Sequence, residues 1–161
     1  MSELSYMEKL LEGVEVEWLF LSEIVELKRG KRLVKSQLSD VGKYAVYQNS
    51  MTPLGYYHQS NTSTDTTYII CAGAAGEIGF STSPLWAADD VYYLVSPEKL
   101  SSKYIYYFLL TQKSKILSQV RRASIPRLSR TAFEKMPVPI PCPNTPEKSL
   151  AIQSEIVRIL D

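Results

Sequence analysis

The chain has 161 residues, 45% of them hydrophobic and 22% charged, with a net charge of +1. This length allows one domain with a real hydrophobic core, and the composition is that of an ordinary globular protein. The longest apolar run, YIYYFLL at 104–110, is too short to span a bilayer. The first residues lack the basic and apolar regions of a signal peptide. We therefore expect a cytoplasmic protein with no membrane partner.

The first half of the chain predicts one helix followed by strands. Within residues 1–14 a helix is expected as far as about Leu11, because Leu4, Met7, Leu11 and Val14 follow one apolar stripe and Gly13 provides a stop. From residue 18 to residue 95 the pattern changes to β-branched and aromatic runs bounded by turn residues. The clearest predicted strands are YAVY (44–47), GYYH (55–58), TYIICA (67–72) and VYYLV (91–95).

A helix is predicted after Ser101, which can cap it, because apolar residues recur at helical spacing as far as Val120. The next stretch, QVRRASIPRLSR at 119–130, is predicted to be a loop, since a proline in its middle cannot continue a helix. We expect Ile125 and Leu128 to anchor this loop in the core, so that its arginines point outward at fixed positions.

The last part of the chain predicts an extended segment and a final helix. MPVPIPCP at 136–143 alternates prolines, which suits an edge strand or an extended connector. A helix is predicted over 146–161, with Thr145 as its N-cap and Pro146 at its first position. Strands and helices together predict an α/β fold.

The residue types that catalysis needs are scarce. His58 is the only histidine, and no Ser/His/Asp set or metal-ligand cluster can be drawn, so we expect no catalytic residue, no metal and no cofactor. The glycines of AGAAGEIG (72–79) follow G-x-x-G-x-x-G spacing, which favours a turn over a dinucleotide-binding loop. The aspartate pair at 89–90 lacks the further carboxylate and lysine of a nuclease motif and is expected at a turn or strand start. Cys71 and Cys142 are expected to be reduced.

The charge is unevenly distributed along the chain. Residues 1–26 hold seven glutamates and one lysine, a charge of −6, whereas residues 27–161 hold 17 basic and 10 acidic residues, a charge of +7. Two clusters contain no acid: LKRGKRLVK (27–35) with five basic residues and residues 113–130 with six. Such clusters fit a phosphate backbone, because each Lys or Arg near a phosphate releases a counterion. The alternatives are solvated loops, with arginines stacked on tyrosines, and charges that scatter without function.

Arginine can also form a forked contact with guanine in the major groove, and Asn or Gln with adenine. The candidate DNA-contacting residues are therefore Lys28, Arg29, Lys31 and Arg32 from the first cluster, Arg121, Arg122, Arg127 and Arg130 from the second and, as weaker candidates for base edges at a hairpin tip, Gln48, Asn49 and Ser50.

Several segments, taken in order, follow the pattern of one family. They are EWLFLSEIVELKRGKRLVKSQL, GKYAVYQNSMTPLGYY, TYIICAGAAGEIGFS, LWAADDVYYLV, SKYIYYFLL and ASIPRLSRTAFEKMPVPIPCPNTPEKSLAIQSEIVRILD. Through them the chain resembles, over residues 17–161, a target recognition domain of the specificity subunit of type I restriction-modification systems. The resemblance implies an α/β domain with a twisted, partly barrel-like β-sheet and flanking helices. It divides the chain into an N-terminal helix (1–14), the recognition domain (15–145) and the start of a spacer or dimerisation helix (146–161).

The resemblance also implies a non-catalytic subunit that reads one half of a split double-stranded DNA target. Its implied partners are modification (methyltransferase) subunits and, in the full complex, a restriction subunit. A homodimer through the terminal helices is allowed, and both a fragment and a naturally short subunit stay open. The alternative function is a protein-interaction module that docks a methyltransferase subunit without DNA contact of its own. A stand-alone nuclease is disfavoured because its carboxylates are missing.

Overall fold

Nine strands in residues 3–161, the part of the chain that the computed structural model describes, are divided among three small sheets. The expected α/β class is thus confirmed, and none of these sheets closes into a barrel. The four-stranded sheet has the order β2 (Glu26–Arg29), β8 (Val91–Val95), β5 (Thr66–Ile70) and β6 (Ile78–Ser81). The three-stranded sheet has the order β4 (Gly55–Tyr57), β3 (Tyr44–Tyr47) and β7 (Trp86–Ala87), and a two-stranded ribbon joins β1 (Val16–Phe20) to β9 (Pro137–Pro141).

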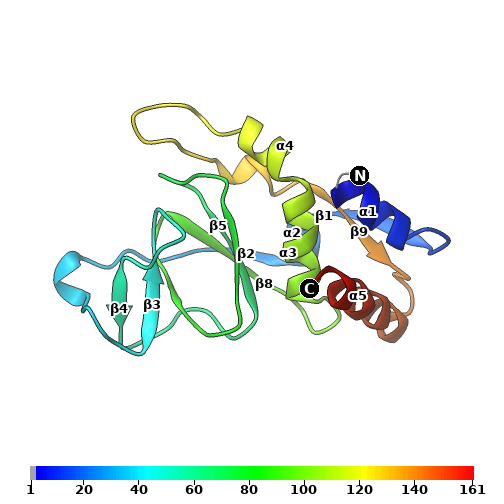
Figure 1. Ribbon diagram of the computed structural model, residues 1–161, viewed down its shortest axis with the longest axis horizontal. Helices are drawn as coiled ribbons and strands as arrows, with labels where there is room; N and C mark the ends of the chain where they lie inside the picture. Colours follow the sequence, from blue (N-terminus) through cyan, green and yellow to red (C-terminus); the bar gives the residue numbers. More distant parts are fainter. Residues whose placement is uncertain (1–2) are drawn as a thin grey trace.

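The helices gather at the end of the molecule that carries both termini (Figure 1). They are α1 (Glu3–Leu10), α2 (Leu21–Ile24), α3 (Ser102–Thr111), α4 (Lys113–Ser118) and α5 (Pro146–Leu160), with 3-10 turns η1 (Lys35–Gln37) and η2 (Arg130–Ala132). The three-stranded sheet forms the opposite end. The helix predicted within 1–14 is confirmed in its described part: α1 ends at Leu10, close to the expected end near Leu11, and Gly13, at φ 78°, follows. The first two residues of that prediction lie outside the described residues.

The central strand β5 is buried along its whole length, because the four-stranded sheet is covered on both faces. On one face Ile69 packs with α3 residues such as Ile105 in the main core. On the other face Tyr68 and Ile70 pack in a smaller cluster with residues of the β7 region. This two-sided burial fixes the register of β5, since a one-residue slip would exchange the two apolar sets.

The helix predicted after Ser101 forms as two pieces. Ser101 caps α3 as expected, because its side-chain oxygen accepts a hydrogen bond from the Tyr104 N–H (3.1 Å). The chain then breaks at Gln112 and resumes as α4. The predicted apolar face is confirmed in both pieces, and Ile116 of α4 is fully buried.

Two local elements depend on contacts that are distant in sequence. The short helix α2 was not predicted; it is held by main-chain bonds from Leu21 N–H to Met136 O and from Ser22 N–H to Glu134 O, both 2.9 Å. The proline-rich segment is confirmed as a strand, β9, which pairs antiparallel with β1. The alternating prolines mark β9 in the sequence, whereas α2 has little intrinsic helix signal and depends on these main-chain bonds.

The final helix begins as expected, with Pro146 at its first position, although the side chain of Thr145 makes no capping hydrogen bond. Its buried Gln153 accepts a hydrogen bond from Ser101 N–H (2.8 Å) and donates to Lys99 O (3.3 Å). These bonds fasten α5 to the start of α3. In the described part of the chain, no helix combines the length and the apolar character needed to cross a bilayer.

We predict that Tyr104→Phe lowers the free energy of unfolding by about 1–3 kcal/mol, because it leaves a buried acceptor without its donor. The fully buried Tyr104 hydroxyl donates to Pro139 O (2.6 Å) and so ties α3 to β9. Urea unfolding checks this, with Tyr107→Phe as the matched control, since the Tyr107 hydroxyl bonds the exposed Asp161 carboxylate (2.5 Å). Equal stability of the two variants would contradict the prediction.

Candidate nucleic-acid interface

One residue of the first basic cluster and three of the second converge on one cleft of about 360 Å³. Arg29, at the end of β2, lines it from one side, and Arg121, Arg127 and Arg130 line it from the segment that follows α4. Its other lining residues are Cys71, Asp89, Asp90, Tyr92, Gln119, Leu128 and Ser129. Residues about 90 positions apart in the chain are thus brought to a single site.

The arginine-rich segment is a loop, as predicted, and main-chain hydrogen bonds hold its shape. Arg121 N–H donates to Arg127 O (2.7 Å) and Arg127 N–H to Arg121 O (3.1 Å), which closes residues 121–127 into a narrow loop. The yellow loop that extends from α4 in Figure 1 is this segment. Arg121 and Arg127 therefore lie directly opposite each other at the base of the loop, beside the cleft.

The same loop is fastened to the end of β5. Leu128 N–H donates to Cys71 O (2.8 Å), and Gly73 N–H donates to Pro126 O (3.0 Å). Leu128 is buried, at 4% exposure, as predicted. The prediction for Ile125 is wrong: its side chain is 53% exposed, because the main chain and Leu128, rather than Ile125, attach the loop to the core.

On the other side of the cleft, the backbone at the end of β2 approaches the backbone before β8 closely. Gly30 N–H donates to Val91 O (2.8 Å), and a Cβ placed on Gly30 would lie 2.1 Å from Ala88 O, so only glycine fits. Just before it, Arg29 Nε donates to Asp89 O (2.8 Å). This bond orients the guanidinium while leaving its two terminal nitrogens available.

The 48–50 turn lies against the glycine turn that follows β5. Ala74 N–H donates to Asn49 O (2.9 Å), and a Cβ on Gly73, which has φ 76°, would lie 2.7 Å from the same oxygen. The glycine turn that the sequence predicted is therefore confirmed, and the backbone it approaches is the chain's own. Gln48 Nε2 donates to Asp90 Oδ2 at a long 3.4 Å.

The predicted contact residues differ in how free their side chains are. Ser50 Oγ bonds within its own turn, to Thr52 O (3.1 Å), and Asn49 is exposed. Arg130 is paired with Glu134 (3.0 Å), whereas Arg122 is exposed near the loop tip. Asn49 and Arg122 are thus available to a ligand, while Ser50 and Arg130 would have to exchange existing bonds.

The first basic cluster is split between two faces of the sheet. Lys28 is paired with Tyr93 of the neighbouring strand, and Tyr93 packs against the smaller apolar cluster. Because successive side chains of a strand point to opposite faces, Lys28 points away from the cleft that Arg29 lines. An exposed pair with Glu26 (3.7 Å) also involves Lys28. Lys31 and Arg32 are exposed in the segment after β2.

Sequence reasoning did not select Asp89 and Asp90 as site residues. The prediction of a turn or strand start is confirmed, since they form the turn that directly precedes β8. They also line the cleft, and Asp89 Oδ1 is buried without a hydrogen-bond partner. A cluster of three or more His, Cys, Asp or Glu that could hold a metal does not occur among residues 3–161. Only the long-range pairing of β2, β8 and β5 reveals the position of these carboxylates.

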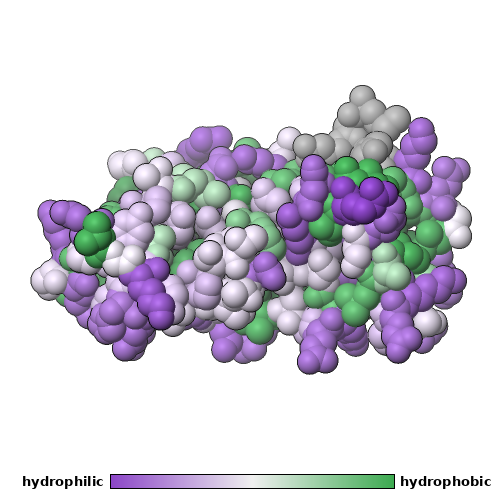
Figure 2. Space-filling view, turned by 60° about the horizontal axis from the view of Figure 1, so that its bottom comes forward, coloured by the Kyte–Doolittle hydropathy of each residue, from purple (hydrophilic) through white to green (hydrophobic). Residues whose placement is uncertain are grey.

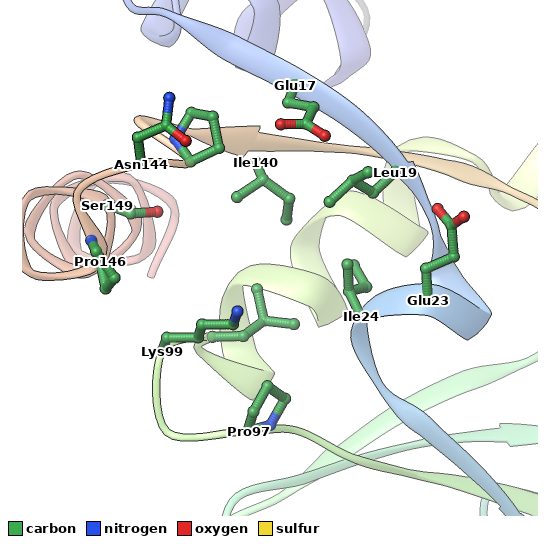
Figure 3. Close-up of a pocket in the computed structure, with 12 residues that line it drawn as sticks. Glu17, Leu19, Glu23, Ile24, Pro97, Lys99, Ile140, Asn144, Pro146 and Ser149 are labelled. Carbon is green, nitrogen blue, oxygen red and sulfur yellow. The ribbon is translucent and has the colours of Figure 1, made fainter.

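A second pocket, of about 270 Å³, lies between the β1–β9 ribbon, α2 and the start of α5 (Figure 3). Leu19, Ile24 and Ile140 occupy its middle, and Glu17 and Glu23 stand along the β1 side. Glu23 already accepts a hydrogen bond from the Phe20 N–H (2.9 Å). Lys99 also lines this pocket, but the two carboxylates outweigh its single positive charge, so the pocket is poorly suited to a polyanion and the arginine-lined cleft is the better candidate site.

We predict that an alkylating reagent at pH 8 labels Cys142 but not Cys71 in the folded protein, and both in urea. Burial raises the pKa of Cys71 to about 12, so its thiol stays protonated and unreactive at pH 8, whereas Cys142 is only half-buried. Mass spectrometry checks the labelling, with Cys142→Ser as the control. Rapid labelling of Cys71 in that variant would mean that the loop does not cover the end of β5.

Comparison with known proteins identifies the family of this chain. Residues 13–161 match the model of the type I restriction modification DNA specificity domain. The chain is 37% identical over its whole length to the Escherichia coli "Type I restriction enzyme EcoR124I/EcoR124II specificity subunit", covering 41% of that protein, and 31% identical to the EcoprrI specificity subunit of the same species, covering 45%. It thus spans less than half the length of these relatives.

Solved structures agree in fold. The type I restriction-modification S subunit from M. genitalium superimposes with a TM-score of 0.76 over 89% of this chain and 38% of that one, at 18% identity. The HsdS subunit from Thermoanaerobacter tengcongensis gives 0.68 over 98% and 43%, at 15% identity. With a family match over nearly all of its residues, the chain belongs to the type I restriction modification DNA specificity domain family.

Proposed function

We propose that this chain binds double-stranded DNA in a sequence-dependent way through the arginine-lined cleft and the loops around it. The observation that carries this proposal is the convergence of Arg29, Arg121 and Arg127 on one cleft, each on backbone that hydrogen bonds hold in place. Guanidinium groups bind phosphate by charge and guanine by a forked pair of hydrogen bonds. Rigid placement matters because sequence reading requires donors at fixed positions rather than on a mobile tail.

The proposed biological role is that of part of a specificity subunit, reading one half of a split target. The family match and the specificity subunits among the relatives support this role. In it, the chain itself catalyses nothing; modification subunits methylate and a restriction subunit cuts, in the cytoplasm where the DNA is. The family assignment also favours DNA recognition over a module that only docks a methyltransferase.

Protein partners are proposed to bind at the other end of the molecule. The face shown in Figure 2 carries apolar side chains around the end where Figure 1 places α1 and α5. Trp18 and Phe20 of β1 and Ile159 of α5 are large apolar residues with 53%, 44% and 38% of their surfaces exposed. A modification subunit, or a second copy joined through the terminal helices, would cover such surface and leave the cleft open to DNA.

We predict that replacing Arg121, Arg122 and Arg127 together by glutamine weakens duplex binding and flattens its salt dependence. Each lost phosphate contact should reduce the slope of log K against log salt by about 0.9. Titration of a labelled duplex with the purified chain at several salt concentrations measures this. The control replaces three exposed lysines near the terminal helices by glutamine, namely Lys9, Lys99 and Lys148. It changes the total charge equally and should retain the steep slope.

Identical slopes for the wild type and the arginine variant would rule out the 121–128 loop as a DNA contact. Absence of any salt-dependent binding by the wild-type chain at low salt would instead favour the interaction-module alternative.

We predict that Ile159→Asp weakens association with a modification subunit and leaves DNA affinity unchanged, because it places a charge in an exposed apolar part of α5. Ser154→Asp, at an exposed polar position of the same helix, is the matched control and should behave as the wild type. Co-purification with the modification subunit measures the effect. If both variants co-purify as well as the wild type, the α5 end is not the docking surface.

A further inference from the structure

The cleft is not uniformly basic, and this restricts what it can bind. Asp89 and Asp90 line it together with the arginines. A phosphate beside these two carboxylates would juxtapose like charges, which is costly. The part of the cleft next to the aspartates therefore suits a group that offers hydrogen-bond acceptors and donors side by side, while the arginines of the 121–128 loop remain suited to phosphates.

One arginine and one aspartate in this cleft are direct neighbours. Arg29 Nε donates to the main-chain oxygen of Asp89, which leaves the terminal guanidinium nitrogens free to donate elsewhere. No ion pair joins Arg29 to Asp89 or Asp90 within the described residues, so the guanidinium and the carboxylates do not neutralise each other by direct contact.

The Asp89 carboxylate also has an unused acceptor. Its Oδ1 is buried and accepts no hydrogen bond from the residues that the structure describes. A buried polar atom without a partner is destabilising, and such atoms are uncommon in folded proteins. By contrast, Asp90 Oδ2 already accepts a hydrogen bond from Gln48. Because Oδ1 is closed off from solvent, an incoming donor would reach Asp89 through Oδ2, which is not enclosed and accepts no hydrogen bond among the described residues.

The major-groove edge of a G·C pair has the matching arrangement. Guanine offers the acceptors N7 and O6, which arginine binds in a forked manner, and cytosine offers the N4 amino group, which aspartate accepts. We infer that Arg29 and Asp89 together read one G·C base pair of the target, with the guanidinium on guanine and the carboxylate on cytosine. This inference rests on the proposed DNA-binding function and names two specificity-determining residues within it.

The test is selection of bound duplexes from a randomised pool by the full 161-residue chain and its variants, followed by sequencing. The wild type is expected to select G·C at one position. Asp89→Asn preserves shape and the main-chain acceptor of Arg29, and Arg29→Lys preserves charge but loses the fork. Each should lower the preference for G·C at that same position at least about fivefold, while preferences elsewhere and the salt slope persist.

Asp65→Asn is the matched control, because it makes the same charge change in an exposed residue at the opposite end of β5, and its φ of 53° is one that asparagine tolerates. It should retain the wild-type preferences. Unchanged preferences in both Asp89→Asn and Arg29→Lys, or relaxation at two different base pairs, would overturn the inference while leaving DNA binding intact. A wild-type chain that selects no duplex would overturn the proposed function together with it.

Discussion

The main chain of one residue, Cys71 at the end of β5, joins the parts on which the site depends. Its N–H donates to Asp90 O (2.7 Å), and its carbonyl accepts from Leu128 N–H (2.8 Å). The first bond holds the turn that carries the two aspartates and contacts Arg29; the second holds the arginine loop. Both bonds are shielded, since Cys71 is 8% exposed, so they compete little with water. The geometry of the cleft follows from the position of this one strand end.

The position of the strand end in turn follows from burial. β5 is covered on one face by the main core and on the other by the small cluster beneath the three-stranded sheet. Loops that are hydrogen-bonded to such a strand keep their shape without an apolar core of their own. The arginine loop can therefore be ordered although Ile125 remains largely exposed. Rigid scaffolds that present functional loops are a common solution for binding proteins. Here the four-stranded sheet lies in the middle of an elongated molecule, between the three-stranded sheet at one end and the terminal helices at the other (Figure 1).

Local patterns predicted the elements well, and long-range contacts explain the exceptions. The runs at 44–47 and 91–95 are strands with the expected bounds, because aromatic and β-branched residues favour strands and turn residues flank them. α2 could not be foreseen, as its bonds come from residues 134–136. Lys28 and Arg29 looked equivalent in sequence, yet strand alternation sends them to opposite faces. Asp89 gained importance only once β8 was seen beside β2, since no local pattern marks a carboxylate as part of a basic cleft.

Hydrogen–deuterium exchange of the whole chain, with and without a duplex enriched for binding, tests the central claim most directly, because ligand contact slows local opening and amide exchange. DNA binding through the cleft predicts slower exchange in the 121–128 loop, at Asn49 and in the turn at 88–91, with α5 unchanged. Protection confined to the terminal helices, with unaltered exchange around the cleft, would contradict it.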